Sequence, residues 1–145
     1  MKKFVIKVHT EGNQYQKPHL FSLSKGYNVG RPLKDPCPNC FVILTDSEEE
    51  KQKMFFLLDG IWRSQIFRVQ LVGSVIPFIH VHEFAKTVNR YWDHVHECDK
   101  RVDKLISAFA AIEKLQSQIQ GLTKLLDQYK SIAYLDVLKI QKAEF

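Results

Sequence analysis

Two cysteines stand two residues apart in the segment DPCPNC, a spacing shared by metal knuckles and redox pairs. A redox pair lies where a strand leads into a helix, because the helix dipole lowers the pKa of the first thiol. Cys40 instead leads into the apolar run CFVIL, which predicts a strand and disfavours redox chemistry. Cys37 and Cys40 could supply two of the four ligands of a structural zinc ion.

The remaining two zinc ligands would have to come from histidines and the third cysteine. The candidates stand at alternate positions in two segments, FIHVHEF and DHVHECD: His80, His82, His94, His96 and Cys98. The second segment is expected to be helical, so that only its i, i+4 pair shares a face. Knuckles of the CPxC kind usually continue with glycine, whereas Phe41 follows here. The sequence therefore favours a proline-shaped turn into a buried strand, with zinc bound by Cys37 and Cys40 as the alternative.

The sequence contains no arrangement typical of an enzyme. Gly73-Ser74 lacks the flanking residues of a nucleophile elbow, and the glycines form neither GxGxxG nor a P-loop. The acidic run 48–50 is explained as the start of a helix. We therefore expect a protein without catalytic activity and without a cofactor.

The positive charge is concentrated near the N-terminus. The chain has a formal net charge of +5, and residues 1–35 contain seven basic and two acidic residues, which accounts for all of it. A localised basic, amide-rich surface suits phosphate contact, because each neutralised phosphate releases counterions; an ordinary solvated face is the alternative. On a DNA-binding surface, the expected phosphate contacts are Lys17, Lys25, Arg31 and Lys34, and the expected base-edge contacts are Asn28 and Gln16.

Composition sets limits on the class of protein. A hydrophobic content of 45% with 12% aromatic residues argues against disorder. No apolar run of ~18 residues could span a membrane. Three cysteines, an odd number, fit a reducing cytoplasm better than a disulfide scaffold.

Local patterns predict the elements of the first half. KFVIKVHT, a short stretch near HLFSLS, and CFVILT read as strands. Ser47 followed by Glu50 is a capping-box pattern, which predicts a helix from there to about Ser64. The segment IFRVQLVGSVIPFIHVHEF reads as β-type material interrupted by Gly73-Ser74 and Pro77.

The second half reads as helix from about Glu83 to Lys142. Apolar residues recur there at spacings of three and four: Val102, Leu105, Phe109, Ile112, Leu115, Ile119, Leu122, Leu126 and Tyr129. The spacing from Ile112 to Leu115 is a stammer, which locally overwinds a coiled coil. Such a segment either folds back as a hairpin or pairs with a second copy, and we expect a homodimer through about residues 99–135.

These elements predict an α+β protein. We expect a small mixed or antiparallel sheet with one packed helix, followed by a long C-terminal helix or helical hairpin. Residues 1–84 would form the small domain and residues 85–145 the helical segment.

The segment GSVIPFIHVHEF followed by a long helix resembles the end of a target-recognition domain in the DNA-specificity subunits of type I restriction-modification enzymes. The positions that carry this resemblance are Gly73, Ser74, Ile76, Pro77, Ile79, Glu83 and Phe84. It covers about residues 41–135, although such domains are usually longer and a full subunit has two of them. The stretch GRPLKDPCPNCFV also resembles small uncharacterised bacterial proteins.

The resemblance implies a half-subunit, in which two copies joined through their helices present two DNA-recognition surfaces. Methyltransferase or restriction subunits would then be partners. The leading hypothesis is a non-enzymatic, dimeric DNA-binding module in the cytoplasm. The alternatives are a protein-interaction or assembly module that binds through its C-terminal helix, and a small zinc-binding domain.

Overall fold

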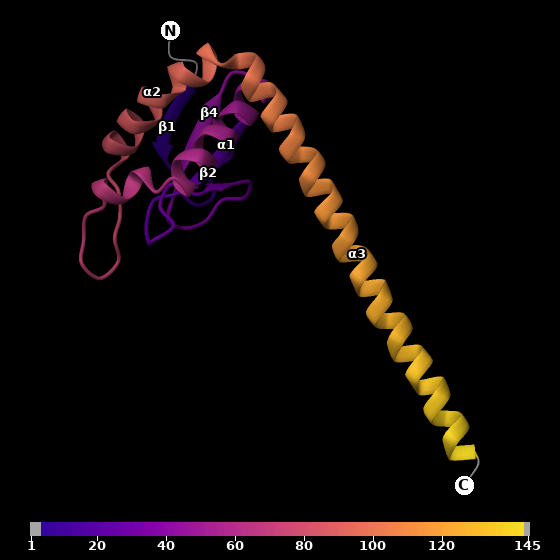
Figure 1. The fold of residues 1–145 in the computed structure, drawn as a ribbon. Helices are drawn as coiled ribbons and strands as arrows, with labels where there is room; N and C mark the ends of the chain where they lie inside the picture. The colour runs from indigo at the N-terminus through magenta and orange to yellow at the C-terminus, as the bar shows by residue number, and fades with distance from the viewer. Residues whose placement is uncertain (1–3, 144–145) are drawn as a thin grey trace. The chain divides into compact units, whose positions relative to one another are not determined.

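A four-stranded antiparallel sheet forms the centre of the N-terminal part of the chain. The computed structural model describes residues 4–143, with side chains up to residue 139. The strands are β1 (Phe4–Val8), β2 (His19–Leu23), β3 (Pro32–Leu33) and β4 (Cys40–Thr45), in the order β1-β4-β2-β3. The helices are α1 (Glu48–Arg63), the 3-10 helix η1 (Ile66–Gln70), α2 (Val81–Glu97) and α3 (Asp99–Ala143) (Figure 1). This arrangement confirms the expected α+β class, with a long C-terminal helix.

Helix α1 begins where the capping pattern predicts. The Ser47 hydroxyl accepts a hydrogen bond from the Glu50 amide at 3.2 Å, and the Glu50 carboxylate accepts one from the Asp46 amide at 3.3 Å. Three acidic residues occupy the first turn, where the helix dipole favours negative charge. Local side-chain chemistry thus fixes where α1 starts.

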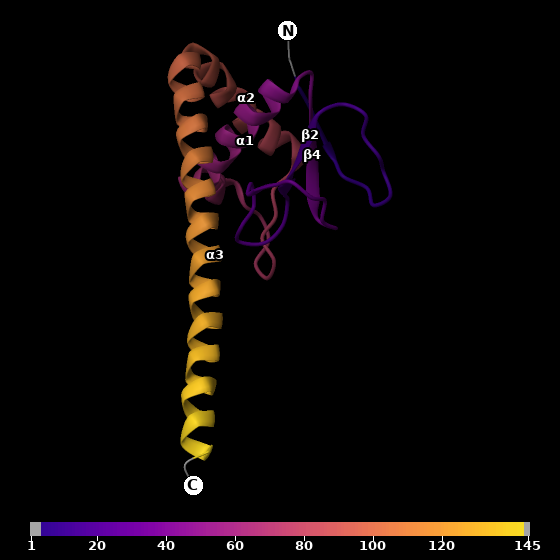
Figure 2. The same ribbon diagram turned by 90° about the vertical axis from the view of Figure 1, so that its right-hand side faces the viewer.

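Helices α1 and α2 lie on the same side of the sheet, and a long loop covers the other side (Figure 2). The larger core contains buried side chains from β2, β4, α1 and α2, including Leu20, Ile43, Leu58 and Phe84. On the opposite face, a smaller cluster forms around Phe21, Cys40 and Val42, with Tyr15 of the loop packed against it. Because both faces of β4 are covered, this strand is continuously apolar, as its sequence predicts.

The β-type interpretation of residues 66–84 is wrong. The segment forms η1, then a loop in which Val72 and Phe78 make an isolated bridge, and then the first turn of α2. Pro77 and the left-handed Gly73, at φ +97°, prevent a continuous strand. His80 therefore precedes α2 and His82 lies in its first turn, not on a strand, and the two rings stack with their centroids 5.5 Å apart.

The helical segment expected from about residue 83 forms two helices that meet at Cys98. The Cys98 amide closes α2 by donating to the His94 carbonyl at 3.1 Å, and the Cys98 carbonyl accepts the first bond of α3 from Val102 at 3.0 Å. Lys53 of α1 is 3% exposed and donates to Asp99 at 2.6 Å and Glu49 at 2.7 Å. This charged contact fixes the first turn of α3 against α1.

The chain divides into a compact unit up to Ile106 and a second unit from Ser107 onward. The expected boundary after residue 84 lies inside α2, which buries Phe84, Val88 and Trp92 in the core. As far as residue 143 the second unit is helical, and the large apolar side chains within residues 107–139 are exposed. No helix within residues 4–143 has the length and apolar character needed to cross a membrane.

Candidate functional site: an arginine–aromatic pocket

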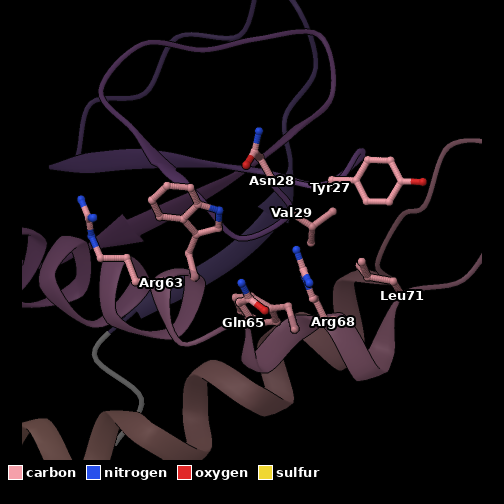
Figure 3. Close-up of a pocket in the computed structure, with 9 residues that line it drawn as sticks. Tyr27, Asn28, Val29, Arg63, Gln65, Arg68 and Leu71 are labelled. Carbon is pink, nitrogen blue, oxygen red and sulfur yellow. The ribbon is translucent and has the colours of Figure 1, made fainter.

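A cavity of about 360 Å³ opens between the β2–β3 loop and the helical segment that follows α1. Its lining combines arginines, amides, aromatic rings and aliphatic side chains: Tyr27, Asn28, Val29, Trp62, Arg63, Gln65, Phe67, Arg68 and Leu71. Figure 3 shows Asn28 and Val29 on the loop across from Gln65 and Arg68, with Tyr27 pointing away from them. We call this site the arginine–aromatic pocket.

The loop wall of the pocket is held in place by backbone contacts. The Gly26 amide donates to the Pro77 carbonyl at 2.7 Å, and the Gly30 amide donates to Leu23 at 2.8 Å. Gly30 has φ +87°, and a Cβ at this position would collide with the ring of Phe67. Only glycine therefore allows the loop to lie directly on the buried Phe67 ring.

The opposite wall depends on how α1 ends. Gln65 follows the helix with φ +57°, a left-handed conformation that is uncommon for a residue with a side chain. Its amide donates to Trp62 at 3.0 Å, and its carbonyl accepts from Arg68 at 3.1 Å. This turn places Trp62 and Arg63 of α1 beside Arg68 of η1 at the same cavity.

Two arginines lie over the indole of Trp62. The guanidinium carbons of Arg31 and Arg63 are each 5.4 Å from its ring centroid, within the range of a cation–π contact. Arg63 also pairs with Asp59 at 2.7 Å. Within residues 4–139, Arg31 and Arg68 have no acidic partner, so their charges remain available to an anion.

The structure brings only some of the predicted DNA contacts together. Asn28 lines the pocket and Arg31 lies over Trp62, while Lys25 stands at the base of the same loop, where it bridges to Phe78. Lys34 is exposed just after β3. Lys17 is bound to Asp46 at 2.8 Å, which neutralises its charge locally.

Gln16, the other predicted base-edge contact, does not line the pocket. Gln16 is exposed in the loop before β2. Lys2 and Lys3 lie outside the described residues. Whether any of these residues contacts DNA stays a prediction.

Several pocket residues were missed by the sequence interpretation: Trp62, Arg63, Gln65 and Arg68. Trp62 lies within the helix predicted up to about Ser64, where nothing singled it out, and the segment containing Arg68 was interpreted as β-type. The available signal was the pair Trp62-Arg63 at the helix end, where an aromatic ring next to an arginine favours a surface contact.

The two cysteines of DPCPNC form a local turn. The Cys40 thiol donates to the Cys37 carbonyl at 2.9 Å, and the Cys37 amide lies 3.4 Å from the Cys40 sulfur. Burial raises the pKa of Cys40 to about 11, so this thiol stays protonated. A bound zinc ion would itself displace the thiol proton, so zinc binding by Cys37 and Cys40 stays a prediction.

The histidine candidates do not assemble around the cysteines. His94 is paired with Glu97 at 3.3 Å, and the ring of His96 packs edge-on against Trp92 at 4.8 Å. Among the residues that the structure describes, no group of three or more His, Cys, Asp or Glu side chains could hold a metal ion.

Comparison with known families gives one match. The sequence model of a family of unknown function, DUF6943, matches residues 6–136. No curated protein matches the chain. No solved structure matches it either. The resemblance to restriction-enzyme specificity subunits therefore stays a prediction.

Proposed function

Because the chain belongs to the DUF6943 family, whose function is unknown, we propose a function from the site itself: a non-enzymatic module that binds nucleic acid through the arginine–aromatic pocket. The observation that carries this proposal is the pair of guanidinium groups over Trp62, with Arg68 at the same cavity. Aromatic rings and arginines together are what nucleic-acid surfaces use to contact bases and phosphates.

Arginine is well suited to this role. Its planar guanidinium donates two parallel hydrogen bonds to a phosphate while its flat face remains on an aromatic ring. The contact with Trp62 restricts both Arg31 and Arg63 before any ligand arrives. A site ordered in advance loses less side-chain entropy when it binds.

The charge around the pocket supports a polyanionic ligand. Lys25 and Lys34 flank the loop that carries Asn28 and Arg31, so a strand leaving the pocket would meet further positive charge. Lys17 contributes less to this surface, because Asp46 already neutralises it. The expected phosphate contacts are therefore Lys25, Arg31, Lys34 and Arg68. Arg63 contributes less, because Asp59 already pairs with it at 2.7 Å.

The pocket lining also supports binding rather than catalysis. Its nine residues include no carboxylate, histidine, serine or cysteine. General acid–base and nucleophilic catalysis rely mainly on such groups. An arginine-rich pocket without them can hold an anionic ligand.

The test measures binding of fluorescent mixed-sequence oligonucleotides by anisotropy at low salt. We expect binding that weakens as salt rises, and loss of about tenfold or more for the double variant Arg31→Gln/Arg68→Gln. A matched control is Arg90→Gln, which removes the same kind of charge from the exposed surface of α2. Absence of binding by the unmodified protein, or an equal loss for Arg90→Gln, would refute the proposal.

A second candidate function is assembly through α3, which the exposed apolar stripe of this helix favours. Its members are between 47% and 70% exposed: Phe109, Ile112, Leu115, Ile119, Leu122, Leu126 and Tyr129. Water-exposed apolar side chains in such a continuous row are typical of a helix that pairs with another helix. We propose that the partner is a second copy of this chain.

A further inference from the structure

We infer that the arginine–aromatic pocket takes one unpaired nucleotide, so that the protein prefers single-stranded nucleic acid to a duplex. The base would enter the cavity, and its phosphates would lie on the arginines at the rim. This inference rests on the proposed nucleic-acid binding and specifies its ligand.

The cavity has an apolar interior suited to a base. Val29 is 3% exposed and Phe67 is 2% exposed, and Leu71 and Trp62 complete the apolar surface. A volume of about 360 Å³ lies within the range of pockets that hold small organic ligands. A flat, heterocyclic base can contact such a surface through its faces whatever its sequence.

The mouth of the cavity offers groups for the two other parts of a nucleotide. The amides of Asn28 and Gln65 can each donate to and accept from the polar edge of a base. The guanidinium groups of Arg63 and Arg68 can contact the phosphates. The lining therefore combines apolar, amide and cationic groups, the three kinds that can contact a base face, a base edge and a phosphate.

A paired base cannot use this site without leaving its helix. In a duplex both faces of a base are stacked and its Watson–Crick edge is occupied. Entry into the cavity would require unpairing and unstacking, a cost that a single strand does not carry. The pocket geometry therefore points to single strands.

The pocket is formed before the ligand binds. The contact between Gly30 and Phe67 fixes one wall, and the left-handed turn at Gln65 fixes the other. The left-handed residue after the C-cap is a common way for a helix to end, and here it sets the direction in which η1 leaves α1.

The experiment compares four ligands by competition: a short single strand, its duplex, a fully abasic strand of equal length, and a mononucleotide. We expect the base-bearing single strand to bind at least about fivefold more tightly than the abasic strand. The duplex should bind more weakly than the single strand. Trp62→Leu should remove the advantage of the bases, whereas Trp62→Phe should retain most of it.

The outcomes separate this inference from the proposed function. Equal binding of base-bearing and abasic strands, with loss of both in Arg68→Gln, would overturn the inference and leave nucleic-acid binding intact. A mononucleotide that binds as tightly as the strand would overturn the assignment to single strands. No binding of any ligand would refute both. Circular dichroism and melting of each variant verify that it folds.

Discussion

The sequence left three roles open for Cys40: a zinc ligand, a redox thiol or a packed apolar side chain. Its thiol is buried at the start of β4 and donates to the carbonyl of Cys37 in the preceding turn. Burial disfavours the thiolate, which raises the pKa of Cys40 from 9.0 to about 11. Cys40 acts as a small apolar side chain, packed in the cluster with Phe21 and Val42, and its thiol also closes the preceding turn.

This raised pKa predicts how stability depends on pH. The unfolded thiol loses its proton from about pH 9, whereas the folded thiol keeps it to about pH 11. The free energy of unfolding should therefore fall as pH rises through this interval, by at most about 1.4 kcal/mol per pH unit from this group. Urea unfolding of the unmodified protein and of Cys40→Ala, at several pH values, measures the difference.

The exposed Cys98 provides the control for this measurement. Cys98→Ala is the matched control, because it removes a thiol that is exposed in the folded chain instead of buried. A Cys40→Ala variant whose pH dependence matches that of Cys98→Ala would contradict the prediction. Lysines and tyrosines also titrate in this range, and comparing the variants removes their contribution.

At the scale of elements, the β2–β3 loop is the part on which the pocket depends most. The loop presents Asn28 to the cavity and is fixed by the close approach of Gly30 to Phe67. The same glycine is therefore a structural requirement of the site without contacting a ligand itself. A second glycine, Gly12, has nearly the same conformation, with φ +86° and open space around it.

Alanine at these two glycines should have unequal effects. Gly12→Ala incurs only the cost of a left-handed conformation, about 1 kcal/mol of unfolding free energy. Gly30→Ala adds a collision with a buried ring, which should cost about 1–3 kcal/mol more. Denaturant unfolding measures both, and anisotropy should show weaker oligonucleotide binding only for Gly30→Ala. Equal losses of stability would show that Phe67 yields freely and that the loop is not held as described.

At the scale of the whole molecule, the sequence predicted the elements that depend on local chemistry. Three of the four strands and α1 were found because alternation and a capping box act over a few residues, as at Ser47 and Glu50, whereas the two-residue β3 was not predicted. The segment 66–84 was misinterpreted because its β-branched residues favour strands, while Pro77 and the burial of Phe67 favour η1 and a loop. The tertiary contact outweighed the local preference.

The pocket could be predicted only in part for the same reason. Asn28 and Arg31 stood out because they lie in a basic, amide-rich segment. Trp62 and Arg68 are more than thirty residues further along the chain and meet the loop only after the sheet and α1 have folded. The concentration of basic residues points to the β2–β3 loop, which forms one wall of the pocket. The other wall, at the end of α1 and in η1, can be identified only from the fold.

Self-association through α3 is the prediction that concerns the molecule as a whole. Burying each stripe residue from its half-exposed state would contribute roughly 1–2 kcal/mol, so seven residues in each of two copies would contribute roughly 14–28 kcal/mol. This sum lies near or above the upper end of the roughly 4–15 kcal/mol cost of association. We expect light scattering after size exclusion to give at least twice the mass of one chain.

The double variant Ile119→Lys/Leu122→Lys should reduce the measured mass to that of one chain, because two charges in each copy would be buried between the paired helices. Gln120→Lys, on the opposite side of the helix, should leave the mass unchanged. A single-chain mass for the unmodified protein at high concentration would contradict self-association and leave the pocket as the remaining candidate site.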